Sequence, residues 1–155
     1  MKRLVEFLIE STDWQAYEDI DGPAVNVARG LTALLESANA EEAEAAYWQL
    51  ENRIVVQGNV YSVCVPAVRI LVASLLNDCG FPVRVAVLDL LYQILSGSSV
   101  SEDPFIIERC RAYVAEGTWL IVREFVFGPR DAARDVLHCL RLDLDFESLA
   151  SIGVH

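Results

Sequence analysis

Apolar residues recur at helical spacing along almost the whole chain. The clearest case is the segment from Glu44 to Pro66, EAAYWQLENRIVVQGNVYSVCVP. It reads as an amphipathic helix, a tight turn at residues 57–59 and a second apolar helix that opens at residue 60. Apolar positions three and four residues apart give each helix one buried stripe. The segment therefore predicts a helical hairpin, the unit from which α-solenoids are stacked.

Glycine, proline and capping residues predict the boundaries of the neighbouring helices. The Gly-Pro pair at 22–23 predicts the start of a helix that runs to residue 35, because proline suits a first helical turn. Asn39 and Glu42 form the pattern of a capping box for the helix of the hairpin. Gly80 is placed for a left-handed cap on the helix that follows the turn.

The second half of the chain is predicted to contain a central helix. Phe81-Pro82 begins the run VRVAVLDLLYQIL, which is apolar on nearly every side, as in a helix packed between others. Residues 96–103 have the composition of a loop, with Ser101 or Asp103 as candidate caps for the next helix.

A long pattern from 104 to 127 predicts further helix, broken or bent at Gly117. The run TWLIVREFVF within it is rich in β-branched and aromatic residues, so a strand is the competing prediction there. Helix is favoured, because no second strand candidate is placed to pair with it. A last helix is expected after residue 129, and the tail from 143 predicts a short helix or an ordered extension.

An internal repetition supports the stacking of hairpins. Arg84 precedes Asp89 by five residues, and Arg130 precedes Asp135 by the same interval, 46 residues later. Units of ~40–47 residues are typical of HEAT and armadillo repeats. These side chains either bond between neighbouring repeats or form an exposed pair on one helix. The expected fold is all-α: a short HEAT-like α-solenoid of stacked antiparallel hairpins, one domain over 1–155. The pattern leaves open whether residues 1–21 pack on it or form a loose extension.

The net charge of the chain indicates which classes of molecule it could bind. The 155 residues carry 23 acidic against 12 basic side chains, a net charge of −11. Phosphate binding needs clustered lysine and arginine, so nucleic acid and anionic membrane surfaces are disfavoured. A basic protein would instead be attracted. Charges interrupt every apolar run before the ~18–20 residues of a membrane span, and no signal peptide is predicted. A cytoplasmic location is expected.

Catalytic and metal chemistry is not indicated. The sequence has no Gly-rich phosphate loop, no Gly-x-Ser-x-Gly and no His-Glu-x-x-His. Its four cysteines, Cys64, Cys79, Cys110 and Cys139, are far apart, which predicts buried thiols; a disulfide or a reactive thiol is the alternative. His138 and Cys139 are adjacent on a predicted helix and so point about 100° apart. We expect neither an enzyme nor a cofactor nor a metal.

The hairpin resembles a known family. Ala46-Tyr47-Trp48-x-Leu50, then VQGxVY at 56–61, the Pro-Ala-Val run at 66–68 and Pro-Val-Arg at 82–84 are similar to small bacterial HEAT-repeat proteins. The resemblance covers about residues 43–95. It implies a partner-binding role, because many such proteins resemble immunity or other interaction proteins encoded beside polymorphic toxins.

Two functions are therefore predicted. The first is an immunity-type protein that occludes the active site of a cognate, basic bacterial toxin with an acidic surface. Its candidate contacts are exposed acids near loops and chain ends together with aromatic anchors: Trp14, Asp19, Asp21, Trp48, Glu102, Asp103, Asp143, Asp145 and Glu147, with Asp13 and Tyr17 beside them. The second is a structural adaptor that self-associates, for example as a homodimer through a terminal helix.

Overall fold

The architecture was analysed in a computed structural model that describes residues 2–99 and 103–154. In this part of the chain there are nine α-helices, one short 3-10 helix and five two-residue strands. The helices are α1 (Lys2–Ser11), α2 (Val27–Leu35), α3 (Ala40–Ile54), α4 (Cys64–Ser74), α5 (Phe81–Ser96), α6 (Ile106–Glu116), α7 (Thr118–Phe127), α8 (Arg130–Cys139) and α9 (Phe146–Ile152), with the 3-10 helix η1 at Trp14–Ala16. The strands are β1 (Glu18–Asp19), β2 (Gly22–Pro23), β3 (Val55–Val56), β4 (Asn59–Val60) and β5 (Ser98–Ser99).

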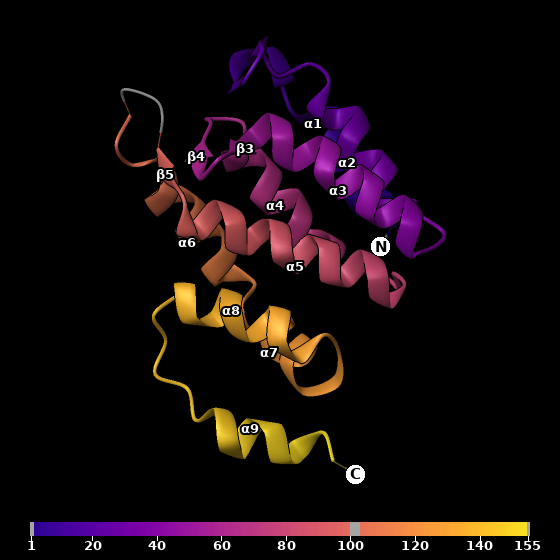
Figure 1. The fold of residues 1–155 in the computed structure, drawn as a ribbon, viewed down its shortest axis with the longest axis vertical. Coiled ribbons are helices and arrows are strands. Elements are labelled where there is room, and N and C mark those ends of the chain that lie inside the picture. The colour runs from indigo at the N-terminus through magenta and orange to yellow at the C-terminus, as the bar shows by residue number, and fades with distance from the viewer. Residues whose placement is uncertain (1, 100–102, 155) are drawn as a thin grey trace.

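The helices pack directly on one another. Figure 1 shows α3, α5 and α8 side by side, and α5 contacts both neighbours. Behind them α4 packs against α1 and α6, α2 packs against α3, and α7 packs between α8 and α9. Buried leucines from α2, α3, α4 and α5 join Phe125 of α7 in one apolar core. The all-α prediction is confirmed, and so is the central position of α5.

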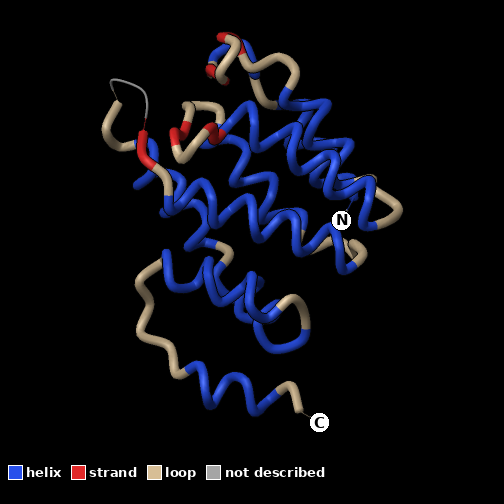
Figure 2. The backbone as a smooth tube through the Cα atoms, viewed as in Figure 1, coloured by secondary structure: helices blue, strands red, loops and turns tan. Residues whose placement is uncertain are grey.

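The turn of the predicted helical hairpin is a β-hairpin. Helices α3 and α4 lie on either side of it as expected, but β3 and β4 pair antiparallel between them, and β5 adds a parallel strand. Gln57 and Gly58 have φ angles of +52° and +78°, the conformation of a two-residue type I′ turn. Such a turn matches the twist of two paired strands, which is why a short ladder forms here. Figure 2 shows how little strand the molecule contains.

Three boundary predictions are confirmed. Asn39 Oδ1 accepts a hydrogen bond from Glu42 N at 2.9 Å and caps α3, while Glu42 Oε2 accepts from Ala38 N at 2.8 Å. Gly117 separates α6 from α7. The run TWLIVREFVF is helix α7 and not a strand, because its apolar residues pack between α8 and α9.

Three other predictions are wrong. Residues 22–23 do not start a helix: they form β2 opposite β1, and α2 begins at Val27. Gly80 is not a left-handed cap, since its φ is −61° and it is the N-cap residue of α5. Asp103 does not cap α6, whose N-cap residue is Phe105; instead Asp103 Oδ1 accepts from Phe105 N at 2.9 Å. The alternative cap, Ser101, lies outside the described residues.

The N-terminal segment packs on the rest of the chain. Val5 of α1 is buried against the core, where α1 contacts α4. Trp14 is also buried, and its indole Nε1 donates a hydrogen bond to Ile9 O at 2.9 Å. In the described part of the chain no helix is both long enough and apolar enough to cross a membrane.

The four cysteines are free thiols, and only two of them are fully buried. Cys64 and Cys110 lie in the core, whereas Cys79 and Cys139 are half-buried. Burial raises the pKa of Cys64 well above its usual value and the pKa of Cys110 to about 12. The prediction of four buried thiols is therefore correct for one pair and too strong for the other.

Candidate functional site

The predicted contact residues do not gather into one surface. Asp21 is exposed at the β1–β2 turn, where its Oδ2 lies 2.9 Å from Arg53 Nη1. Asp103 precedes α6 and pairs with Arg109. Asp143 and Glu147 are exposed around α9, at the far end of the molecule from α1 (Figure 1). Glu102 lies outside the described residues.

Two predicted contacts are buried. The prediction that Asp19 is an exposed acid is wrong, and Trp14 is not available as an anchor on the surface. The side chain of Asp19 is 2% exposed; its Oδ1 accepts from Asp21 N at 2.8 Å and its Oδ2 lies 3.6 Å from Arg53 Nη1. Trp14 is buried under α1, as described above. Both residues hold the N-terminal segment in place, because a buried charge and a buried indole each need a polar partner.

Asp145 is exposed but has a structural task. Its carboxylate caps α9, accepting from Ser148 N at 3.1 Å and from Ser148 Oγ at 2.6 Å. These hydrogen bonds hold the pKa of the Asp145 carboxyl below its usual value. An N-cap of this kind is what an aspartate before a helix is expected to provide.

Two of the predicted contacts, Trp48 and Asp21, lie beside hollows, and Trp48 is the aromatic one. A groove of about 380 Å³ runs between α3 and α5, and we call it the Trp48 groove. Its lining residues are Ala40, Ala43, Glu44, Tyr47 and Trp48 of α3 with Pro82, Val85, Ala86 and Asp89 of α5. The Trp48 side chain is 51% exposed, and its ring meets that of Tyr47 edge-on at a centroid distance of 5.2 Å. The indole of Trp48 thus lies at the groove and is about half open to solvent.

The electrostatics of the groove favour a cation. Burial, followed by the charges of Glu51 and Asp89, raises the pKa of Tyr47 to about 12. Burial and the neighbouring carboxylate of Asp135 on α8 raise the pKa of Asp89, and burial alone raises that of Glu51. Among the described residues that line the groove none is basic, so its negative charges have no local counter-ion. A positive group brought here would lower the free energy of these carboxylates.

The arrangement suits recognition of a basic side chain on an apolar segment. Ala43, Pro82, Val85 and Ala86 offer an apolar floor, and the indole face of Trp48 offers a cation–π surface. Exposed aromatic residues flanked by complementary charge are typical hot spots of protein interfaces. In the described part of the chain, no group of three or more acidic, histidine or cysteine side chains is placed to hold a metal.

Sequence reasoning found Trp48 but missed its acidic partner across the groove. In the sequence, Asp89 was notable only as the aspartate of the pattern that recurs 46 residues later. That repetition does place Asp89 and Asp135 on adjacent helices, α5 and α8, where the charge of Asp135 contributes to the raised pKa of Asp89. The signal was therefore present, although the groove itself depends on how α3 packs against α5.

Comparison of the chain with protein-family models, with curated proteins and with solved structures returned no match. The likeness to HEAT-repeat immunity proteins stays a prediction from the residues.

Proposed function

We propose that this chain is a non-catalytic binding protein that neutralises a basic bacterial toxin domain by occluding its active site. The observation that carries the proposal is the Trp48 groove: an indole that is 51% exposed, beside Glu44 and Asp89. An arginine or lysine of the partner would stack on Trp48 and approach Asp89, while the apolar floor takes the aliphatic part of that side chain.

The arrangement of the helices supports the proposal of a HEAT-like fold. Helices α3, α5 and α8 lie side by side, and α1, α4 and α6 pack in sequence behind them (Figure 1). Stacked helical units of this kind present extended surfaces to partners. The hairpin residues that carry the resemblance, 43–95, include both walls of the groove.

The net charge of −11 supports a basic protein as the partner and disfavours nucleic acid and anionic membranes. The acids predicted at the chain ends then act at long range, by attracting the partner, and the Trp48 groove makes the close contact. Rim charges of this kind mainly alter the rate of association and its dependence on salt.

Co-expression with the protein encoded immediately upstream tests the proposal, with host survival and co-purification scored together. We expect rescue and a stable 1:1 complex. In that complex Trp48→Ala should weaken binding by about 30-fold or more, the effect of losing one hot-spot aromatic worth ~2 kcal/mol. Glu44→Lys should slow association and make it less sensitive to salt.

The matched control is Trp119→Ala. Trp119 lies on α7 and is 75% exposed, so it removes a similar aromatic surface away from the groove. Binding by this variant should equal that of the wild type. Wild-type affinity of both Trp48→Ala and Glu44→Lys would show that the partner does not use the groove.

A self-associating adaptor is the second candidate, and α7 supplies the observation that favours it. Trp119, Arg123 and Phe127 are exposed at intervals of four residues and so form one outward stripe on that helix. Phe127 is 69% exposed, and large apolar side chains in such a row are candidates for contact with a second copy. Light scattering that shows a dimer, lost in Trp119→Ala and kept in Trp48→Ala, together with no complex and no rescue, would favour the adaptor.

A further inference from the structure

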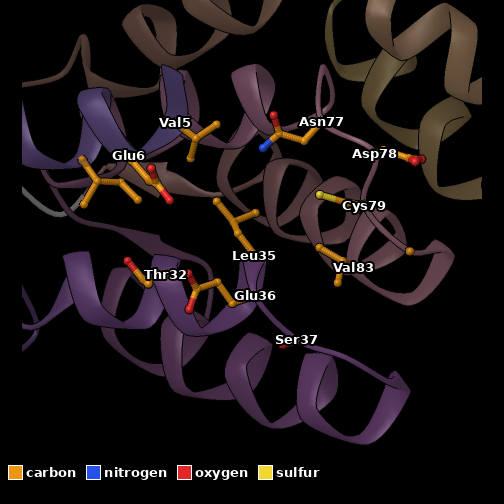
Figure 3. A pocket seen from close by; sticks show the side chains of 12 residues that line it. Val5, Glu6, Thr32, Leu35, Glu36, Ser37, Asn77, Asp78, Cys79 and Val83 are labelled. Carbon is orange, nitrogen blue, oxygen red and sulfur yellow. The ribbon is translucent and has the colours of Figure 1, made fainter. Parts of the chain in front are cut away.

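The two terminal helices are attached differently. Helix α1 buries Val5, which lies on the wall of a hollow of about 590 Å³ that α1 shares with α2 and the start of α5 (Figure 3). Trp14, just after α1, is buried as well. Helix α9, at the opposite end of the molecule (Figure 1), has no buried residue. Of the two terminal helices, α9 is therefore the one that can leave the core at little cost.

Helix α9 packs on α7 through one face. Its side chains Phe146, Leu149 and Ala150 are partly buried against the core, at positions i, i+3 and i+4 of the helix. Gly153, at i+7, continues this face, and a Cβ there would collide with Val126 O. Helices that bind in a groove of another protein use anchors with this spacing. The α7 surface that α9 covers is therefore built to receive a short amphipathic helix.

Phe146 is the main anchor of α9. Its ring meets the ring of Phe125 edge-on at a centroid distance of 5.3 Å and the ring of His138 at 5.0 Å. Among the described residues, only one hydrogen bond joins α9 to the other helices, from Arg130 Nη2 to Ala150 O at 3.5 Å. An element with so few contacts opens locally far more often than the core does. Because α9 has only seven residues, it needs such a surface to stay helical.

The connection between α8 and α9 favours an exchange of α9. Residues 140–145 form no helix or strand and follow an open path along one side of the molecule (Figures 1 and 2). Arg141 has a φ of +56°, a left-handed conformation that is unfavourable for a residue with a Cβ. Short connections under strain favour the exchange of a terminal element between copies, because the strain is released while the same contacts form again.

We propose that α9 is exchanged between two copies of the chain, so that the α9 of each copy packs on the α7 of the other. The interaction surface is the face of α7 around Phe125, and its partner is a second copy, which supplies the four anchors that fit it. The dimer forms the same contacts as the monomer. The balance between the two therefore depends on the connection and on protein concentration.

The exchange is separate from the functions proposed above. It does not involve the Trp48 groove, so its failure would leave the proposed function unchanged, and the reverse also holds. It also uses a different face of α7 from the self-association of an adaptor. Phe125, which contacts α9, is 1% exposed, whereas Trp119 and Phe127 of the outward stripe are 75% and 69% exposed.

The first experiment changes the length of the connection. Deletion of residues 141–143, which are exposed, leaves too little chain for α9 to return to its own α7, so α9 can reach only a second copy. The wild type should dimerise only near 1 mM, because a short connection gives an effective concentration of about that size. The deletion should lower the dimer dissociation constant at least about tenfold, measured by light scattering.

Insertion of Gly-Ser-Gly after Leu142 is the matched control, and it should not strengthen the dimer. A deletion variant that stays monomeric up to about 1 mM, or that dimerises no more than the insertion variant, would overturn the inference. Arg141→Gly tests the strain at unchanged length. Glycine adopts a positive φ freely, so the dimer fraction at about 1 mM should fall below that of the wild type. An increased dimer fraction in Arg141→Gly would contradict the role of the strained connection.

Substitutions in the deletion variant identify the surface that joins the two copies. Phe146→Ala removes the main anchor, so it should raise the dimer dissociation constant about 30-fold or more. Ser151→Ala alters an exposed residue of α9, and Trp119→Ala alters the outward stripe of α7, so both variants should keep the dimer. A dimer that survived Phe146→Ala unchanged would overturn the exchange, because its interface would not contain α9.

The ring resonances of His138 show whether α9 is docked. His138 lies 5.0 Å from the Phe146 ring, so its chemical shifts respond to that contact. In the dimer of the deletion variant these shifts should equal those of the wild-type monomer, because the same contact forms between copies. Full-length Phe146→Ala supplies the reference without the Phe146 ring. Shifts in the dimer that matched this reference would show that α9 is not exchanged.

Discussion

Helices α5 and α8 begin with the same pattern, yet their arginines contact different groups. Arg84 of α5 donates from Nε and Nη2 to Glu124 Oε2, at 2.7 and 2.5 Å, and that carboxylate is 1% exposed. Arg130 of α8 donates from Nε to Phe125 O at 3.1 Å and lies 5.5 Å from the centre of the Phe125 ring. The two repeated arginines therefore hold consecutive residues of α7. The repetition marks helix packing around α7. Among the described residues, neither Arg84 nor Arg130 forms an ion pair with Asp89 or Asp135, either between the repeats or within one helix.

The two aspartates of the pattern differ as well. Asp89 is half-buried between α3 and α8, whereas Asp135 is exposed. The pKa of Asp89 is raised, because burial and the charge of Asp135 both disfavour its ionised form. One sequence pattern thus yields an ion pair with a buried carboxylate and a half-buried aspartate on α5, and a half-buried arginine bound to backbone carbonyls and an exposed aspartate on α8. Burial, which the local pattern does not encode, makes the difference.

Substitution of Arg84 should cause the largest loss of stability. Arg84→Ala leaves the buried Glu124 carboxylate with only Arg123 Nη2, 3.0 Å from Oε1. We expect a loss of about 3 kcal/mol in the free energy of unfolding, the usual result of breaking a buried ion pair. Arg130→Ala should cost about 1 kcal/mol, because the carbonyls of Phe125 and Ala150 each lose a hydrogen bond and no charge is left buried. Urea unfolding measures both values.

A double variant shows whether the cost comes from the charge left behind. Arg84→Leu with Glu124→Leu removes both charges, so most of the stability lost in Arg84→Ala should return. Equal losses in Arg84→Ala and Arg130→Ala would contradict the contrast between the two helices.

Gly128→Ala should have the second largest effect, because it disturbs the same ion pair by steric contact. A Cβ at this position would collide with Glu124 Oε2 and Arg84 Nη2. The pair would have to shift, at a cost of about 2 kcal/mol. Gly80→Ala is the matched control: its Cβ would meet only Pro82 Cδ, at 3.8 Å, so the change should stay within about 1 kcal/mol. Thermal unfolding of the two variants compares them directly, and similar Tm values would rule out the collision.

Local signals in the sequence predicted most helices. They did not predict the structure at positions where contacts between distant segments determine it. The Asn39–Glu42 cap and the break at Gly117 depend on neighbours in the chain, and both were predicted correctly. Residues 22–23 were misassigned because the pairing of β2 with β1 overrides the preference of proline for a first helical turn. Of the candidate site, Trp48 was predicted from its residue type and helix position. The groove beside it was not, since it requires the packing of α3 on α5.

Exposure was the property predicted least well. Asp19 lies in an acidic stretch that reads as solvated surface, yet it is buried because Arg53, 34 residues further on, reaches it from α3. Trp14 is buried beside the end of α1, where its indole Nε1 donates to Ile9 O. The burial of Asp19 depends on a contact between distant segments, and the local sequence gives no signal of it.

The smallest change in the free energy of unfolding is expected for substitution of Asp89. This change is stabilising, and its size relative to that at Asp135 distinguishes α5 from α8. The pKa of Asp89 is raised in the folded protein, so the protonated form is favoured there. Its ionisation therefore costs stability, and this cost is complete above the raised folded pKa and vanishes below the ordinary value of 3.8. Asp89→Asn should stabilise the protein at pH 7 by about 0.5 kcal/mol, the order of one like-charge contact. That gain should disappear as the pH falls toward 3.8.

The comparison with Asp135→Asn completes the test. This variant removes the charge that repels Asp89, so it should also stabilise at pH 7, but by less, because the burial of Asp89 remains. Urea unfolding of the two variants and the wild type between pH 3.5 and 7 gives the three curves, with ~0.2 kcal/mol needed to separate them. If Asp135→Asn stabilised as much as Asp89→Asn, repulsion between the helices and not burial would be the main cause. The half-buried position of α5 would then differ from the exposed position of α8 only through its neighbour's charge.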